Sequence, residues 1–171
     1  MKNRKSLYKG EVVDLGLERV TLPNRQTMQL EVVRHPGGAA IVTLDNDNRV
    51  CLLRQYRHAA GGWLWELPAG KIDSPESPQH TAQRELQEEA GLIAKDWLML
   101  GSFLSTPGFC DERIYLYLAR NLTNTCTDHQ AHEVIEVHWI EFQQALEWVH
   151  TGEIVDGKTM LGLLITERET R

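Results

Sequence analysis

One run of residues, from Gly70 to Leu92, constrains the fold of this chain more than any other part. Ser77 followed by Pro78 is typical of a helix N-cap and its first turn, and Gly91 is typical of the residue that ends a helix. This spacing predicts a helix of roughly three to four turns. The chain must therefore fold around a helix whose two ends are set by local sequence.

The predicted helix carries a cluster of carboxylates. Glu85, Glu88 and Glu89 are spaced i, i+3 and i+4, so they share one face of the helix. Like charges at this spacing repel by a few tenths of a kcal/mol per exposed pair. Such a cluster is kept most easily when a cation neutralises it, and oxygen ligands suit Mg²⁺ or Mn²⁺. A charge run is more often a solvated helix face, so the cluster alone leaves both interpretations open.

The residues around the cluster extend the pattern. They follow the order Gly-x5-Glu-x7-Arg-Glu-aliphatic-x-Glu-Glu-x-Gly-aliphatic, and every defined position is filled. The flanking residues that match are Gly70, Glu76, Arg84 and Gly91. A match of this length is far more specific than a lone glycine-rich loop. The chain therefore resembles the Nudix hydrolases, whose signature motif is the Nudix box.

The resemblance implies a metal site built on this helix. It makes Glu85 and Glu89 the principal ligands and Glu88 an additional ligand, and the backbone carbonyl oxygen of Ala69 joins them. Two or three Mg²⁺ ions per site are expected, with Mn²⁺ as a possible substitute. Such a cluster can neutralise bridging phosphates, activate a water and stabilise a leaving phosphate.

The other box residues are expected to be structural. Arg84 and Glu88 form an i, i+4 pair, so Arg84 is expected to orient a glutamate of its own helix rather than to contact substrate. Glu76 is expected to tie the preceding loop to the helix. Gly70 and Gly91 frame the motif.

Features outside the box resemble the ADP-ribose pyrophosphatase group. The run Arg54-Gln-Tyr-Arg57 precedes Glu66-Leu-Pro-Ala-Gly70, and Pro107 lies fifteen residues after the box. The resemblance implies that Arg57 contacts the diphosphate or the terminal ribose, which suits an arginine fork. The alternative for Arg57 is a surface arginine at a strand end.

Two acids beyond the box are candidates for catalysis. The run from Ser105 to Glu112 resembles the substrate loop of the group, so Glu112 is expected to contact substrate or water. The strand that begins at Glu133 resembles a segment whose glutamate contacts metal or acts as the base. Related sequences often carry another acid two positions earlier, where this chain has Ala131.

The identity of the base is therefore open. Glu133, Glu112 and the box glutamates are the candidates, and His132 is an outside candidate, although a loop histidine is more often solvated. Arg34 is expected to reach phosphate in an ADP-ribose-like pose. The N-terminal strands offer Tyr8 and little else for stacking on a base.

The strand pattern predicts a mixed α/β fold. We expect a Nudix-type α/β/α sandwich with a mixed central sheet and an antiparallel N-terminal extension. Residues 1–35 contain predicted strands at 11–15, 18–22 and 28–33, with too little apolar content for a core of their own. They are predicted to be a dimerisation extension, and residues 36–171 the Nudix hydrolase domain.

Within that domain three further local predictions follow from the pattern. Residues 39–44 and 50–53 are predicted to form a hairpin around a polar loop. Residues 121–132 are polar and are predicted to be a loop. Two helices, roughly 141–150 and 156–168, are predicted to close the chain.

Composition excludes some classes of protein. The 171 residues suffice for one well-formed core, and the net charge of −6 disfavours a nucleic-acid binder. Cys51, Cys110 and Cys126 have no metal-ligand spacing, which favours free thiols in a reducing cytoplasm. No apolar stretch reaches the about 18 residues that a membrane span needs, so no membrane association is expected.

The leading functional hypothesis is Mg²⁺-dependent hydrolysis of ADP-ribose to AMP and ribose 5-phosphate. Its nearest rival is the same fold acting on GDP-mannose or another nucleoside diphosphate sugar. A hypothesis of another class is a non-catalytic Nudix-like regulator that binds such a ligand. The box is complete and no attached DNA-binding segment is evident, which favours the enzyme.

Overall fold

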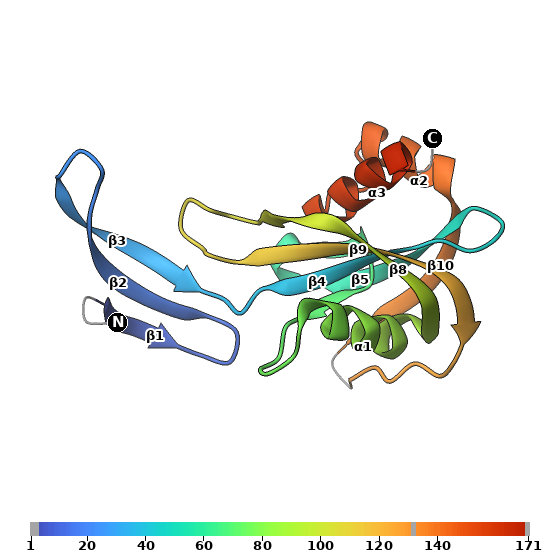
Figure 1. The fold of residues 1–171 in the computed structure, drawn as a ribbon, viewed down its shortest axis with the longest axis horizontal. Coiled ribbons are helices and arrows are strands. Elements are labelled where there is room, and N and C mark those ends of the chain that lie inside the picture. Colours follow the sequence, from blue (N-terminus) through green and yellow to red (C-terminus); the bar gives the residue numbers. More distant parts are fainter. Residues whose placement is uncertain (1–3, 131–132, 170–171) are drawn as a thin grey trace.

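The computed structural model of the chain describes residues 4–130 and 133–169 (Figure 1). The strands in this part of the chain are β1 (Arg4–Lys9), β2 (Asp14–Thr21), β3 (Thr27–Arg34), β4 (Gly38–Thr43), β5 (Arg49–Arg57), β6 (Gly62–Glu66), β7 (Ala69–Lys71), β8 (Leu92–Leu104), β9 (Arg113–Asn124) and β10 (Ile135–Glu141). The helices are η1 (His58–Ala60, a 3-10 turn), α1 (Pro78–Ala90), α2 (Phe142–Thr151) and α3 (Gly157–Glu169). None of the helices described is long and apolar enough to cross a membrane.

The body of the molecule is built from two sheets covered by helices. One is a mixed sheet in the order β7-β4-β9-β8, in which β4 and β9 run parallel. The other is antiparallel, in the order β10-β5-β6. Helix α1 covers one side of these strands, and α2 and α3 cover the other (Figure 1). The predicted mixed α/β fold with terminal helices is confirmed, although its strands are divided between two sheets.

The predicted hairpin of residues 39–44 and 50–53 is wrong. These residues form β4 and β5, which belong to different sheets and share only one isolated bridge, between Leu44 and Val50. Strand β4 is buried at every position, and both of its edges are already paired, with β7 and β9. A strand with this environment reads as a continuous apolar run, so its sequence carries no signal for its partner.

The predicted loop at residues 121–132 is wrong in its first part. Residues 121–124 complete β9 and pair with the first residues of β8. Their side chains are mostly exposed, so the strand shows no apolar alternation that sequence reasoning could detect. Residues 125–130 have no regular structure, as predicted.

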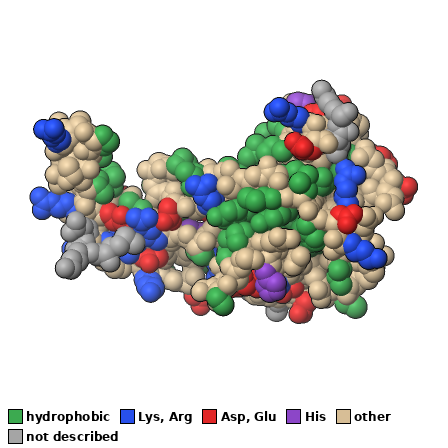
Figure 2. Space-filling view, in the orientation of Figure 1, with side chains coloured by type: hydrophobic (Ala, Val, Ile, Leu, Met, Phe, Trp, Pro, Cys, Tyr) green, Lys and Arg blue, Asp and Glu red, His purple; other side chains and the backbone are tan. Residues whose placement is uncertain are grey.

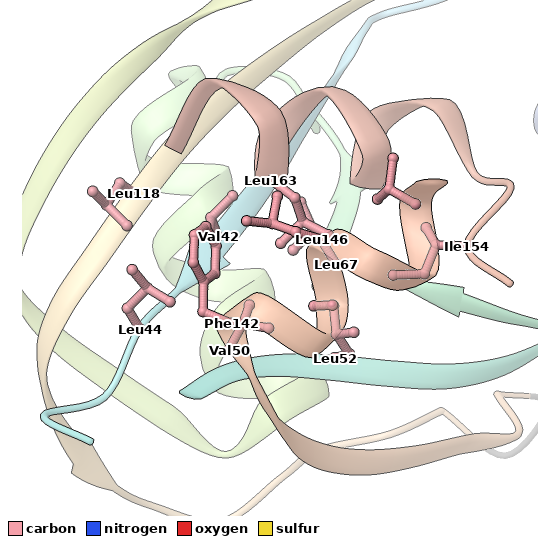
Figure 3. Close-up of a cluster of buried hydrophobic side chains, with 12 residues drawn as sticks. Val42, Leu44, Val50, Leu52, Leu67, Leu118, Phe142, Leu146, Ile154 and Leu163 are labelled. Carbon is pink, nitrogen blue, oxygen red and sulfur yellow. The ribbon is translucent and has the colours of Figure 1, made fainter. Parts of the chain in front are cut away.

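A large apolar cluster joins α2 and α3 to the sheets (Figure 3). Its fully buried members include Val42, Leu67, Phe142 and Leu163. Gly162 of α3 lies directly against this cluster, because a Cβ there would be 2.8 Å from Leu67 Cδ1. The close approach holds α3 tightly on the sheets, and the N-terminal end of α3 is thereby fixed in place.

A second apolar cluster determines how α1 is oriented. Ala82, Leu86 and Ala90 of α1 are buried and pack on Ile41 and Cys51, among others. Positions four residues apart lie on one helix face, so these residues form the face that α1 turns to the sheets. The glutamates at adjacent positions are carried along the border of that buried face.

The N-terminal strands form a separate antiparallel sheet, β1-β2-β3, that projects from one end of the body (Figure 1). In the space-filling view it is a distinct lobe (Figure 2). The strands predicted at 11–15 and 18–22 both overlap one strand, β2, which begins only at Asp14, and β1 was not predicted. Strand β1 has little apolar pattern, and ion pairs from Arg4 to Asp14 and to Glu18 hold it on β2.

Candidate active site

Helix α1 begins and ends where its sequence predicts. The Ser77 side chain accepts a hydrogen bond from the His80 backbone N–H at 3.2 Å, and Pro78 opens the first turn. Gly91 has a φ of +64°, and its N–H bonds back to the Gln87 carbonyl oxygen. A left-handed residue at this position satisfies a carbonyl group at the end of the helix. The helix is therefore a rigid support for the acidic side chains.

Two glutamates of α1 reach the backbone of β7. Glu89 is only 5% exposed, and its Oε2 accepts the Ala69 N–H at 2.8 Å. The Glu85 carboxylate lies on Gly70, because a Cβ built at Gly70 would be 1.9 Å from Glu85 Oε1. Only a glycine leaves room for this carboxylate, which gives Gly70 a steric role. The two acids and residues 69–70 form one compact unit.

The environment of this unit disfavours negative charge. Burial raises the pKa of Glu89 to about 8, and the nearby charges of Glu85 and Glu133 act in the same direction. Burial also raises the pKa of Glu85, against the opposing effect of Arg84. The charged forms of carboxylates that are crowded together and shielded from water are stabilised by a bound cation. The electrostatics therefore favour a bound positive ion next to Glu85 and Glu89.

Arg84 connects the helix to the preceding loop. Its Nη1 donates to Glu85 Oε1 at 2.7 Å and to Glu88 Oε2 at 2.9 Å. Its Nε donates to Glu76 Oε1 at 3.1 Å, and Glu76 also accepts from the Thr81 hydroxyl. These hydrogen bonds hold the pKa of Glu76 down at about 2. Arg84 thus orients two helix glutamates, and Glu76 anchors the loop to the helix.

The residues present fit a hard divalent cation. The side chains of Glu89 and Glu85, which contact Ala69 and Gly70, are carboxylates, and Mg²⁺ and Mn²⁺ prefer oxygen ligands. In the described part of the chain no three acidic, His or Cys side chains already stand around one point as ligands. Arg84 holds Glu85 and Glu88 in hydrogen bonds, so metal binding would draw these carboxylates away from the guanidinium.

A pocket of about 460 Å³ opens beside these acids. Ala69 and Gly70 form part of its wall, and the side chains that also line it come from well-separated segments. These residues include His35, Arg57, Lys71, Ser105, Glu112, Asp156 and Lys158. The volume suits a small organic ligand, and the lining mixes cations with carboxylates.

Comparison with known proteins decides the family. The model of the NUDIX domain matches residues 34–160. The chain belongs to the Nudix family. The predicted membership, and with it the prediction of a hydrolase of this family, is confirmed.

Three similar proteins illustrate the match. The methanol dehydrogenase activator of Bacillus methanolicus is 36% identical over 159 residues, which are 92% of this chain and 86% of that protein. The ADP-ribose pyrophosphatase of Bacillus subtilis is 34% identical over 158 residues, 91% of this chain and 85% of that protein. The crystal structure of an ADP compounds hydrolase shares the fold with a TM-score of 0.84, over 98% of this chain and 91% of that one, at 17% identity.

The Nudix box residues lie together in space. Glu85, Glu88 and Glu89 line one side of α1 as predicted from their spacing, but they differ in environment. Glu89 is buried, Glu85 is nearly so, and Glu88 is 36% exposed and held by Arg84. Their assignment as metal ligands, with the Ala69 carbonyl oxygen, stays a prediction that this arrangement accommodates.

Among the predicted substrate contacts, Arg57 and Glu112 line the pocket and Arg34 does not. Glu112 lies 3.2 Å from His35 Nδ1. Arg34 instead donates to both carboxylate oxygens of Glu18 and to Asp111, with distances of 2.6–2.8 Å. In this structure Arg34 ties the N-terminal sheet to the loop before β9, so a phosphate contact would require these bonds to be released.

Glu133 lies near the Nudix carboxylates. Its charge acts on both Glu85 and Glu89, and its own Oε2 accepts the Gln130 N–H at 2.8 Å. Ala131, where related sequences often carry an acid, lies outside the described residues. So does His132, the outside candidate for the base. The choice of base among Glu133, Glu112 and the box glutamates stays a prediction.

Sequence reasoning missed two residues of this Nudix site. Glu66 is 2% exposed and binds Arg57, and Lys158 of α3 lines the pocket. Glu66 stands in the run that precedes the box, but the resemblance gives this acid no role. Lys158 lies in a terminal helix far from any motif, and no local pattern marks it.

Proposed function

We propose that this protein hydrolyses the diphosphate bond of ADP-ribose and releases AMP and ribose 5-phosphate. The observation that carries the proposal is the placement of Glu85 and Glu89 on residues 69–70, which also line a pocket with Arg57 on its wall. Acids that favour a divalent cation thus adjoin a cavity with a phosphate-binding side chain. The related ADP-ribose pyrophosphatase of Bacillus subtilis supports the same substrate.

The roles of the residues follow from this arrangement. Glu85 and Glu89 hold the divalent cations with help from Glu88 and the Ala69 carbonyl oxygen, and we expect two or three Mg²⁺ ions, replaceable by Mn²⁺. When bound, these ions neutralise the diphosphate and lower the pKa of an attacking water.

The remaining residues bind substrate and move protons. Arg57 donates hydrogen bonds to diphosphate oxygens, and its planar fork suits them. Glu133 removes a proton from water during the attack, and Glu112, which lines the pocket, contacts the substrate.

A second substrate class shares all of this machinery. GDP-mannose or another nucleoside diphosphate sugar would use the same metal and phosphate contacts, and would differ only in the base and sugar pockets. A ligand-binding regulator is the alternative of another class. The relative named methanol dehydrogenase activator is the observation that favours it.

A panel of nucleoside diphosphate derivatives tests the proposal. With Mg²⁺ present, ADP-ribose should be cleaved fastest, and the monophosphate products should release inorganic phosphate after phosphatase treatment. Chelation of the metal should stop the reaction, because the arginine and lysine side chains of the pocket cannot activate the attacking water as a divalent cation does. Intact ADP-ribose together with cleaved GDP-mannose would favour the rival substrate. If every compound stays intact, the regulator is the better description.

The N-terminal sheet is proposed to make the protein a homodimer. Several apolar side chains of its strands and of the turn between β1 and β2 are exposed, namely Leu7, Tyr8, Val12, Val13, Met28 and Leu30. The three buried clusters of the described residues all lie beyond residue 38, so the sheet has no core of its own. A projecting sheet with exposed apolar residues is stabilised when a partner covers it.

Solution mass tests the dimer. Light scattering at micromolar concentration should give twice the mass of the 171-residue chain, and removal of residues 1–35 should give a monomer or an insoluble product. A monomeric full-length protein would contradict the proposal.

A cytoplasmic location is part of the proposal. Cys51, Cys110 and Cys126 are all free in the structure, which suits a reducing compartment. No nucleic-acid or membrane partner is proposed.

A further inference from the structure

A buried carboxylate joins two cations at the wall of the pocket. Glu66 at the end of β6 is 2% exposed. Arg57 Nε and Nη2 donate to its two oxygens at 2.8 and 3.0 Å, and Lys158 Nζ donates to Oε2 at 2.5 Å. Arg57 closes β5, whereas Lys158 stands in the first turn of α3, 92 residues after Glu66. Only the packing of α3 on the sheets brings the three together.

Glu66 is ionised in spite of its burial. Burial opposes its charge, but the hydrogen bond from Arg57 and the charge of Lys158 together lower the pKa of Glu66 below its usual range. A buried carboxylate of this kind costs desolvation energy, and two charge-assisted partners offset that cost. Because Glu66 is almost fully buried, it acts at the pocket through Arg57 and Lys158 rather than by contact with a ligand.

Both cations keep donors for a ligand. Among the described residues, Arg57 Nη1 has no protein partner, and Lys158 Nζ bonds to Glu66 and Asp156 only, although an ammonium has three protons. Both residues line the pocket beside Ala69 and Gly70. Arg57 is also close enough to Glu89 for that charge to act on its pKa. The free donors therefore face the same space as the metal-binding acids.

We propose that Lys158 is a second phosphate-binding cation of the active site, and that Glu66 is a positioning residue that holds Arg57 and Lys158 in one orientation toward the diphosphate. This inference rests on the proposed function, because it requires a diphosphate in the pocket. Arg57 supplies a directional fork, and Lys158 supplies a point charge; both contact Oε2 of Glu66.

Glu66 makes the proposal sharply testable, because two physical effects predict opposite results. If only net charge mattered, a negative residue behind the cations would weaken anion binding, and Glu66→Gln would tighten it. If orientation matters more, the neutral amide releases both cations and binding weakens. A preorganised donor loses less conformational entropy on binding, so we expect the loss of orientation to outweigh the gain in net positive charge.

The experiment compares Lys158→Gln and Glu66→Gln with Lys95→Gln, a control in an exposed position on β8. Thermal unfolding first establishes that each variant is folded. The KM for ADP-ribose should rise about tenfold in Lys158→Gln and in Glu66→Gln, with a smaller change in kcat, as expected for the loss of one charge-assisted contact. Lys95→Gln should match wild type. An unchanged or lower KM in a folded Glu66→Gln protein would overturn the positioning role, and an unchanged KM in Lys158→Gln would overturn the cation role.

A binding measurement separates this inference from the proposed function. Titration calorimetry with inorganic pyrophosphate and Mg²⁺ should show weaker binding to both variants. If wild type cleaves no nucleoside diphosphate compound but the variants lose pyrophosphate affinity, the proposed function fails and the inference stands. If wild type cleaves ADP-ribose and neither measurement changes in the variants, the inference fails and the function stands. Should Glu66→Gln not fold, Lys158→Gln decides the cation role by itself, and positioning by Glu66 is abandoned as inseparable from folding.

Discussion

Glu85→Gln should lose Mg²⁺-dependent turnover by on the order of 10²–10³-fold while the protein stays folded. Glutamine has nearly the same shape, so it can occupy the space over Gly70 and accept a hydrogen bond from Arg84. It lacks the charge that a divalent cation requires. The substitution also removes one of several carboxylates that repel one another near Glu89 and Glu133. Without metal, the thermal midpoint of the variant should therefore equal or exceed that of wild type.

Steady-state rates across a Mg²⁺ titration, with thermal unfolding in parallel, check this expectation. Glu147→Gln is a matched control, because Glu147 is an exposed glutamate of α2 away from the pocket. It should keep wild-type turnover. Full activity in Glu85→Gln would show that the acidic face of α1 does not bind the catalytic metal. If the wild-type protein shows no Mg²⁺-dependent turnover, the substitution cannot reduce it, and the regulator hypothesis is favoured.

Gly70→Ala should also lose most activity, by on the order of 10²-fold, with little loss of stability. The added methyl group would lie 1.9 Å from Glu85 Oε1, so the two cannot coexist in the present arrangement. The carboxylate is the end of a flexible side chain, and it can rotate away at small cost. Gly70 does not have a left-handed φ, so alanine brings no backbone strain. The fold should survive with Glu85 displaced from the metal site.

The same kinetic and unfolding measurements apply to this variant. Gly62→Ala is the matched control, because Gly62 is also a strand glycine without a left-handed φ, and a Cβ there meets nothing within 4 Å. Its rate should stay close to wild type. If Gly70→Ala keeps wild-type kcat, the contact between Glu85 and the backbone of β7 is dispensable for catalysis. A large drop in thermal midpoint would instead mean that Gly70 serves the fold rather than the site.

The acidic helix was predictable because its signals are local. The cap at Ser77, the stop at Gly91 and the spacing of the glutamates each depend on neighbours within one or two turns. The strand pairings were not predictable in the same way. The turn between β4 and β5 reads as a hairpin, yet β4 is buried on both faces and pairs with β7 and β9. Burial on both faces removes the alternation that identifies a partner strand.

The residues predicted to contact substrate divide along the same line. The resemblance to the ADP-ribose pyrophosphatase group implies that Arg57 and Glu112 contact substrate, and both line the pocket. Arg34 was expected there too, but the chain carries Glu18 and Asp111 to its guanidinium. Whether an arginine meets a phosphate or a carboxylate depends on which residues the fold brings within about 3 Å of it, since both offer oxygen pairs to the same fork.

The sequence by itself determined the helix α1, the set of acids that it carries and the family to which the chain belongs, because these depend on spacing along a short stretch. The tertiary structure alone decided that Glu89 is buried against Ala69, that Glu85 covers Gly70, and that Glu66 meets Lys158 across 92 residues. Such contacts arise from the packing of α1 and α3 on opposite sides of the sheets. Packing depends on shape and burial over the whole core, and no local run of residues encodes it.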